Sequence, residues 1–229
     1  MKPIAVLYWG LIRSLREVYP SHVKYVFTPL SEHSSHEIFV HTWMTPRDVQ
    51  RVWQREVVAS NHPSDAAVLR ATRLLIDDQS VFMRYLKVNW KQFTNNRSNW
   101  DRELQENHLC ALESLQRGFD LFDAEKYSYV VFMRPDMKWF NVIPFPDKNE
   151  TTRRKVVLPL GERRKSDRFA IFPAELAHIY ARRFKYVAEF ARNHRVVAED
   201  LLMYALSKHP TLEFTYFKES AFLERVRPK

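Results

Sequence analysis

The sequence predicts an α/β fold, a single domain in which a mostly parallel central sheet is flanked by helices. Strand-like and helix-like segments alternate through residue 140, which is typical of that class. Residues 127–133 form an almost unbroken run of aromatic and β-branched side chains, as expected of a strand buried on both faces. With 229 residues and no repeat or composition shift that marks a linker, the chain is expected to form one large domain.

The first part of the chain contains the predicted parallel strands and the helices between them. The strands are expected at residues 3–9, 37–43, 73–76 and 127–133. The helices are expected at residues 14–28 with a bend at Pro20, at 44–70 with a loop at 62–65, from 80 onward, and at 100–124 after a loop at 95–99. The last of these helices has the clearest helical spacing of leucine and phenylalanine. Gly10, which tolerates a positive φ, ends the first strand.

The second part of the chain is predicted to complete the sheet. Pro135 cannot donate a ladder hydrogen bond and closes the central strand. The expected elements are an extended Pro-rich segment at 142–147, a strand at 155–160, a charged loop at 161–167, a strand at 168–172, a helix at 173–190 opening at an N1 proline, a helix at 198–209 and a strand at 212–216. Glu199 and Asp200 fall in the first turn of the last helix, where acidic side chains suit the helix dipole.

Composition excludes several classes of protein. An apolar content of 45% and an aromatic content of 14% exclude a mainly disordered chain. The 3 glycines form neither a dinucleotide-binding fingerprint nor a P-loop. The single cysteine, Cys110, excludes an internal disulfide and a Cys-based zinc cluster and suits a reducing compartment. With no signal peptide and no apolar stretch long enough to span a membrane, a soluble cytoplasmic protein is expected.

The formal net charge of +9 predicts an anionic partner. Nucleic acid, a membrane face and phosphorylated or nucleotide-linked small molecules all have the required charge. Three basic clusters could bind nucleic acid or could be solvated surface: Arg153–Lys155, Arg163–Lys165 and Arg182–Arg183. Charge alone does not choose between these partners.

Polar residues follow three of the predicted strands. They are Gly10 and Arg13 after the first strand, Asp77 and Asp78 after the third, and Arg134, Asp136 and Lys138 after the central one. Parallel strands bring their carboxyl ends to one edge of a sheet, where α/β proteins bind ligands. Arginines there can hold a diphosphate in bidentate fashion, and carboxylates can accept from ribose hydroxyls. The alternative is that these are solvated strand ends, with Arg134 and Asp136 forming a plain salt bridge.

Carboxylates elsewhere in the chain could join that edge. Asp136, together with phosphate oxygens and water, could hold a divalent cation. Glu199 or Asp200 would stay ionised at a helix N-terminus and could act as a general base, although helix capping alone also explains them. Asp167 is the remaining carboxylate that could join the site at this edge.

These motifs together resemble GT-A-type glycosyltransferases, and are similar to the small soluble enzymes of this kind that large DNA viruses of algae, such as chloroviruses, encode. The segments that carry the resemblance are Ile4–Arg13, Glu37–Trp43, Asp77–Gln79, Phe132–Asp136, Ser166–Ala170 and Ala198–Leu202. They span nearly the whole chain.

The resemblance implies a GT-A-like single domain. Residues 1–140 would bind a nucleotide-sugar donor, with a UDP-sugar favoured, and residues 141–229 would supply the base and bind an oligosaccharide or glycoprotein glycan acceptor. Arg134-Pro135-Asp136 would stand in place of the D-x-D motif, with Asp136 facing Mn²⁺ or Mg²⁺ and the diphosphate. Because Arg134 replaces the first Asp and can itself neutralise the diphosphate, metal dependence stays open.

The resemblance also implies roles for single residues. Asp200, in a match to the x-E-D motif of inverting enzymes, would deprotonate the acceptor hydroxyl, with Glu199 beside it. Arg13, Arg134 and Lys138 would contact the diphosphate, Asp77 or Asp78 the nucleoside or donor sugar, and Asp167 the donor sugar or acceptor. Two other hypotheses stay open: a basic nucleic-acid-binding or nuclease-like protein, and a catalytically inactive nucleotide-sugar-binding fold. Nucleic acid is the less expected partner.

Overall fold

The structure is a computed structural model. It describes residues 2–45, 50–51, 57–58, 62–94, 102–146, 155–160, 166–218 and 221–223. The predicted loop at 95–99 and most of the charged loop at 161–167 lie outside these residues.

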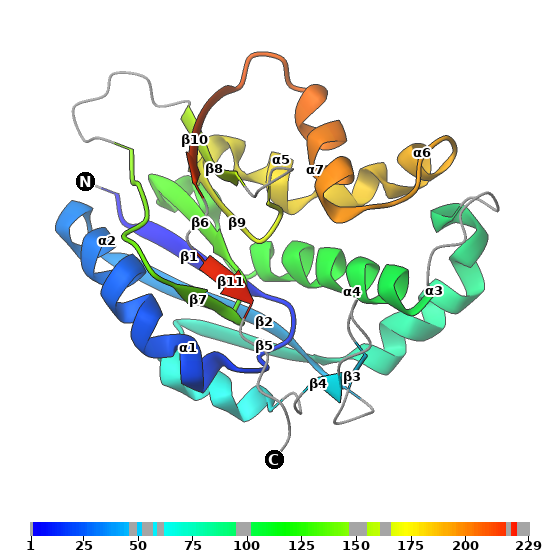
Figure 1. Cartoon of the computed structure of the whole chain (residues 1–229), viewed down its shortest axis with the longest axis horizontal. Coiled ribbons are helices and arrows are strands. Elements are labelled where there is room, and N and C mark those ends of the chain that lie inside the picture. Colours follow the sequence, from blue (N-terminus) through cyan, green and yellow to red (C-terminus); the bar gives the residue numbers. More distant parts are fainter. Residues whose placement is uncertain are drawn as a thin grey trace.

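The predicted α/β fold with a mostly parallel sheet is confirmed (Figure 1). The main sheet has 7 strands in the order β10-β8-β9-β6-β1-β2-β5. Their bounds are β1 Ile4–Trp9, β2 His36–Met44, β5 Arg73–Asp78, β6 Tyr129–Met133, β8 Lys155–Leu160, β9 Phe169–Pro173 and β10 Glu213–Lys218. All neighbouring pairs are parallel except those that β9 makes with β6 and β8. Small two-stranded sheets pair β7 (Met137–Trp139) with β11 (Ala221–Leu223), and β3 (Gln50–Arg51) with β4 (Val57–Val58).

Helices cover both faces of this sheet (Figure 1). Their bounds are α1 Leu15–His22, α2 Thr28–His33, α3 Gln79–Phe93, α4 Arg102–Phe119, α5 Ala177–Ala181, α6 Val187–Ala191 and α7 Ala198–Ser207. Alternate residues of β1 point to opposite faces: Leu7 joins the core with α4, α5 and α7, and Val6 joins the core with α1 and α2. Because both faces of β1 and β6 are covered, their sequences are continuously apolar rather than alternating.

Several expected elements differ from the structure. The helix expected at 44–70 differs from the structure: the described parts include the short strands β3 and β4 and a 3-10 helix, Pro63–Leu69, which begins within the loop expected at 62–65. Pro63 lies in the first turn of that helix, where a missing N–H costs nothing. The helix expected at 14–28 continues to His33 through a π-helical segment, Val23–Phe27, that starts three residues after Pro20.

The helix expected at 173–190 is also broken. It divides into a 3-10 turn Ala174–Leu176, α5, a 3-10 turn Arg183–Tyr186 and α6. Pro173 is the last residue of β9 and precedes the first turn, so the expected N1 position is wrong by one residue. Helix α5 ends just before Arg182. The next residue, Arg183, lies in the protein interior, where its exposed fraction is 0%.

Candidate functional site

The site is at the carboxyl edge of the sheet, between β1 and β6. From β1 the chain proceeds outward on one side to β2 and β5, and the other side of the sheet begins with β6. Such a switch in strand order leaves a crevice at which α/β proteins bind ligands. Gly10, which follows β1, has a φ of 94°, and the antiparallel β9 begins at this edge because Met133 pairs with Phe169.

Arg13, Arg134 and Asp136 form a buried charged triad at this edge. Arg134 Nε lies 2.9 Å from Asp136 Oδ1 and Arg134 Nη2 lies 2.7 Å from Oδ2, so the pair is bidentate. Arg13 Nη1 is 3.6 Å from Oδ2, and the Asp136 side chain is 0% exposed. Burial by itself would lower the pKa of Arg134, but attraction to Asp136, these hydrogen bonds and attraction to Asp167 and Tyr180 outweigh it and raise the pKa. The Arg134 guanidinium group is therefore a permanent cation.

Asp167 connects this triad to a second group around Trp9. Arg183 Nη2 lies 3.9 Å from Asp167 Oδ2, and the Tyr180 hydroxyl donates to the Asp167 carbonyl oxygen at 2.5 Å. The guanidinium carbons of Arg134 and Arg183 lie 6.0 and 5.7 Å from the centre of the Trp9 ring. The two arginines thus lie around one buried indole, and Asp167 interacts with both of them.

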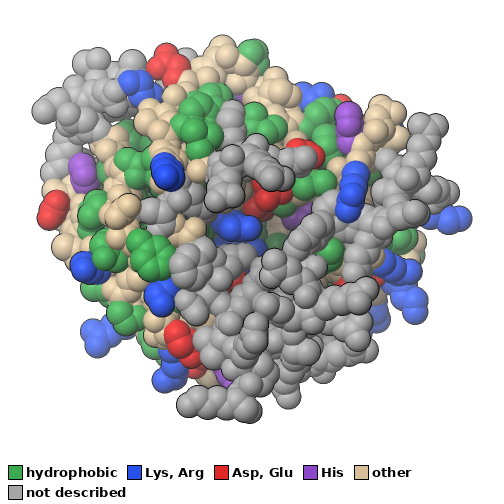
Figure 2. All heavy atoms as spheres, viewed as in Figure 1, with side chains coloured by type: hydrophobic (Ala, Val, Ile, Leu, Met, Phe, Trp, Pro, Cys, Tyr) green, Lys and Arg blue, Asp and Glu red, His purple; other side chains and the backbone are tan. Residues whose placement is uncertain are grey.

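His108, on α4, faces the same group. Burial lowers the pKa of His108 to about 4; Asp167 opposes this change, and Arg183 and Arg134 reinforce it. The imidazole is therefore neutral at pH 7. On the face drawn in Figure 2, Lys or Arg, Asp or Glu, and His side chains lie close together near the centre.

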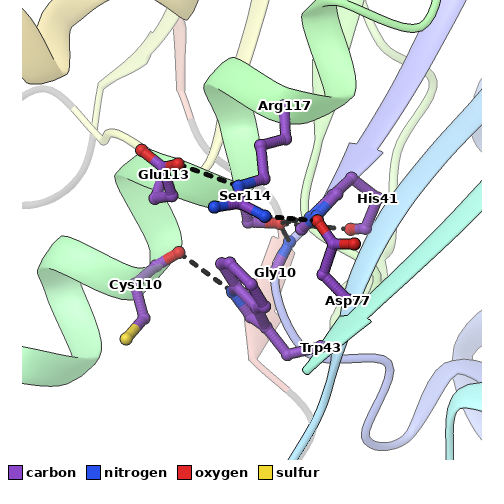
Figure 3. Close-up of polar contacts among 8 residues, drawn as sticks. All are labelled: Gly10, His41, Trp43, Asp77, Cys110, Glu113, Ser114 and Arg117. Carbon is purple, nitrogen blue, oxygen red and sulfur yellow. Dashed lines mark hydrogen bonds and ion pairs between the residues drawn. The ribbon is translucent and has the colours of Figure 1, made fainter. Parts of the chain in front are cut away.

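A third network joins Gly10 to Asp77 (Figure 3). The Gly10 N–H donates to Ser114 Oγ at 2.8 Å, and Ser114 Oγ lies 2.7 Å from His41 Nδ1. His41 Nε2 lies 3.2 Å from Asp77 Oδ2, to which Arg117 Nη1 donates at 2.5 Å. Burial lowers the pKa of His41 to about 4, so the neutral ring donates from Nε2 to Asp77 and accepts the Ser114 hydroxyl at Nδ1.

The structure brings together four of the predicted site residues: Arg13, Arg134, Asp136 and Asp167. Gly10 and Asp77 belong to the Ser114 network instead. Asp78 is the N-cap of α3, where its side chain accepts from the Ser80 N–H at 2.8 Å. The remaining three lie in elements next to the site: Lys138 in β7, and Glu199 and Asp200, both half-buried, in the first turn of α7. That helix packs against the segment that carries Arg183.

Asp136 does not fit the predicted role of metal ligand in this arrangement. Both of its carboxylate oxygens accept from Arg134, and Arg13 lies next to one of them. A cation bound to Asp136 would compete with Arg134 for the carboxylate oxygens, and it would be repelled by the positive charges of both Arg13 and Arg134. Among the described residues, no group of three or more His, Cys, Asp or Glu side chains could hold a metal ion. Dependence on Mn²⁺ or Mg²⁺ stays a prediction, and no step below uses a metal.

Sequence reasoning missed Trp9, His108 and Arg183. Trp9 is read as one more buried strand residue, and His108 lies among the leucines of α4. Arg183 was assigned with Arg182 to a basic cluster, but Arg182 is a surface residue paired with Asp120 at 2.6 Å, whereas Arg183 is buried. No pattern in the sequence distinguishes these two neighbouring arginines. The other basic clusters, apart from Lys155, lie outside the described residues.

Comparison with solved structures finds two glycosyltransferases among the similar chains. One is a glycosyltransferase involved in the glycosylation of the major capsid of PBCV-1, with 8% identity and a TM-score of 0.46 over 94% of this chain and 82% of that chain. The other is mouse xyloside xylosyltransferase 1 in its apo form, with 9% identity and a TM-score of 0.44 over 95% of this chain and 85% of that chain.

No protein-family profile matches the chain, and no curated protein sequence matches it. Both TM-scores are modest. Within the described residues, no helix combines the length and the apolar character that crossing a membrane requires.

Proposed function

We propose that the protein is an inverting glycosyltransferase that moves a sugar from a nucleoside-diphosphate donor, most simply a UDP-sugar, to a hydroxyl group of a glycan. The observation that carries this proposal is the buried Arg13–Arg134–Asp136 triad at the switch in strand order. Arginine forks match the geometry of phosphate oxygens, and a partly desolvated site strengthens that attraction. The net charge of +9 also favours an anionic substrate.

In the proposed reaction the arginines act on the leaving group. As the bond between the anomeric carbon and the phosphate oxygen breaks, negative charge develops on the diphosphate, and Arg134 and Arg13 stabilise it. Asp136 holds the Arg134 fork in place through two hydrogen bonds. No covalent intermediate is needed, because the acceptor oxygen attacks from the face opposite the nucleotide and the configuration inverts.

Asp200 is proposed as the general base. It would take the proton of the acceptor hydroxyl as the new bond to the anomeric carbon forms, so that the products are the glycoside, the nucleoside diphosphate and a protonated carboxyl group. Support comes from its place in the first turn of α7, which packs against the 3-10 turn beginning at Arg183. Asp167 lies between Arg183 and the triad and is proposed to contact the donor sugar or the acceptor.

Ligand binding is the first test. Thermal unfolding is measured with UDP, GDP, CMP and their sugars, each with EDTA and with Mn²⁺, and with oligonucleotides at the same ionic strength. A ligand present at ~100 times its Kd stabilises the folded state by about 2.7 kcal/mol. We expect a response to one nucleoside diphosphate. A response to oligonucleotides without any response to nucleotides would favour the nucleic-acid-binding hypothesis and refute this one.

The base is tested with a matched pair of variants in one helical turn. Asp200→Asn is expected to lower kcat by roughly 100-fold or more, because general-base catalysis contributes about that factor. Glu199→Gln is expected to keep most of the activity, and both variants should bind the donor like the wild type. Equal losses in the two variants would remove Asp200 from the proposed role.

A further inference from the structure

Trp9 and two side chains close to the Arg134–Asp167 group have buried nitrogen atoms without a hydrogen-bond partner. Within the described part of the chain, 8 buried side-chain nitrogen or oxygen atoms have no hydrogen-bond partner, and four of them are Trp9 Nε1, His108 Nε2, and Arg183 Nε and Nη2. Leaving a buried donor unpaired costs about 1–3 kcal/mol, and more for a charged group. Several unpaired buried donors in one part of the protein indicate that a ligand or ordered water binds them.

Arg183 is the least satisfied of these side chains. It is 0% exposed, its Nη1 donates to the Tyr180 carbonyl oxygen at 2.9 Å, and its guanidinium carbon lies 4.1 Å from the centre of the Tyr180 ring. Its Nη2 lies 3.9 Å from Asp167 Oδ2, which is within ion-pair range but too long for a hydrogen bond. One edge of the guanidinium group, Nε with Nη2, is therefore left with two donors and no acceptor.

Among the described residues, the positive charge of Arg183 has no hydrogen-bonded carboxylate, because its Nη2 lies 3.9 Å from Asp167 Oδ2 and its Nε has no partner. His108 adds no charge because burial holds its pKa at about 4. A buried positive charge is costly unless an anion is paired with it through hydrogen bonds.

We propose that Arg183, Trp9 and His108 form a buried binding site for a phosphoryl group. The Nε–Nη2 edge of Arg183 would bind two phosphoryl oxygens, as arginine does in bidentate recognition. The indole Nε1–H and the His108 Nε2–H would donate to the same group. Arg134 and His108 are partly exposed, so the anion can approach from their side.

This site would deepen the proposed function, on which its biological meaning rests. Because the guanidinium carbons of Arg134 and Arg183 lie 6.0 and 5.7 Å from the centre of the Trp9 ring, a diphosphate would contact the triad through one phosphoryl group and Arg183 through the other. The diphosphate would then be neutralised by arginine side chains at both phosphoryl groups. Inorganic pyrophosphate has the same two linked phosphoryl groups but no nucleoside or sugar, and it is therefore the probe.

The experiment compares neighbouring arginines. Thermal unfolding and calorimetric titration with pyrophosphate and with UDP, at constant ionic strength and with EDTA, are carried out on the wild type, Arg183→Met and Arg182→Met. Arg182 is the matched control because it lies on the surface beside Asp120. We expect pyrophosphate to bind the wild type and Arg182→Met equally, and Arg183→Met to bind it at least 10-fold more weakly.

A second variant keeps the test decisive if Arg183→Met does not fold. Trp9→Phe keeps an aromatic ring but removes the Nε1–H, and it should weaken pyrophosphate binding several-fold. Unchanged pyrophosphate binding in the folded variants, or none in the wild type, overturns the inference: ordered water alone then satisfies these atoms. Pyrophosphate binding that depends on Arg183, without a response to any nucleotide sugar, would retain the site and refute the proposed glycosyltransferase.

Discussion

Helix α4 lies so close to the sheet that it leaves no room for a side chain at Gly118. A Cβ atom added there would lie 2.7 Å from Leu7 Cδ1 and 3.2 Å from His41 Cβ. Leu7 and His41 are both 0% exposed, and the Cβ of His41 is fixed by the backbone of β2. Neither neighbour can move away without disturbing the packing of the sheet.

Gly118→Ala therefore sets two effects against each other. Helix propensity favours alanine by about 1 kcal/mol in a helix interior and by less at Gly118, which lies in the last turn of α4. Overpacking a filled core costs about 1–3 kcal/mol, and the short contact to Leu7 places this site at the upper end of that range. The expected result is a net destabilisation of about 1–2 kcal/mol. A secondary effect is a displaced His41 ring and a weakened Asp77 network.

The assay is urea unfolding followed by tryptophan fluorescence and circular dichroism. If the unfolding free energy falls by about 2.5 kcal/mol per molar urea, the urea concentration at the midpoint of unfolding should fall by roughly 0.5 M. Leu7→Val removes the clashing atom, so Gly118→Ala should cost about 1 kcal/mol less in that background. Alanine at the partly exposed Gln116 controls for helix propensity. A Gly118→Ala protein that gains stability, as propensity alone predicts, would refute the close approach of α4.

Three further predictions concern charged and titrating groups. Asp136→Asn removes the fully buried carboxylate that Arg13 and Arg134 share and should lower the unfolding free energy by about 3–5 kcal/mol in urea. A loss below ~1 kcal/mol would contradict the burial of this ion pair. Burial lowers the pKa of His22 to about 4, so the unfolded chain binds the proton first and stability falls as pH decreases from about 6.5 toward 4. His22→Asn should therefore reduce the slope of that decline by at most about 1.4 kcal/mol per pH unit, and an unchanged slope would mean that His22 is not the titrating group. Asp78→Ala should lower the thermal midpoint by a few degrees through loss of the α3 cap, whereas Asp78→Ser should restore it; a lost UDP response in Asp78→Ser would show that Asp78 also contacts ligand.

The central sheet could be predicted because burial on both faces leaves a strong signal in the sequence. The β6 strand was placed to within two residues because Val130–Met133 is continuously apolar and Pro135 follows it. The direction of β9 could not be predicted, because a buried strand has the same composition in either orientation. Its reversal matters for the site, since it places Asp167 at the same edge as Arg134.

The proximity of polar residues that follow strand ends could be predicted, whereas contacts that depend on tertiary packing could not. Arg134 and Asp136 lie next to each other in the chain, so their pairing has a local cause. The contact between the Asp77 carboxylate and Arg117 could not be predicted, because Arg117 comes from α4 and lies far away in the sequence. Burial of Arg183 depends on the break between α5 and its 3-10 turn, and neither glycine nor proline marks that break.

The position of β6 between β1 and β9 also bears on how the chain is made. Trp9 ends β1, and Tyr129, which begins β6, is synthesised 120 residues later. At a rate of synthesis of about 5–20 residues per second, the edge of β1 that pairs with β6 stays unpaired for roughly 6–24 s while the ribosome makes the intervening chain. Once β5 has been synthesised, the β1–β2–β5 layer has an open edge at β1, of the kind that pairs with other chains, until β6 is added. We therefore expect nascent chains that end before β6 to be aggregation-prone and to depend on chaperones that cover this edge.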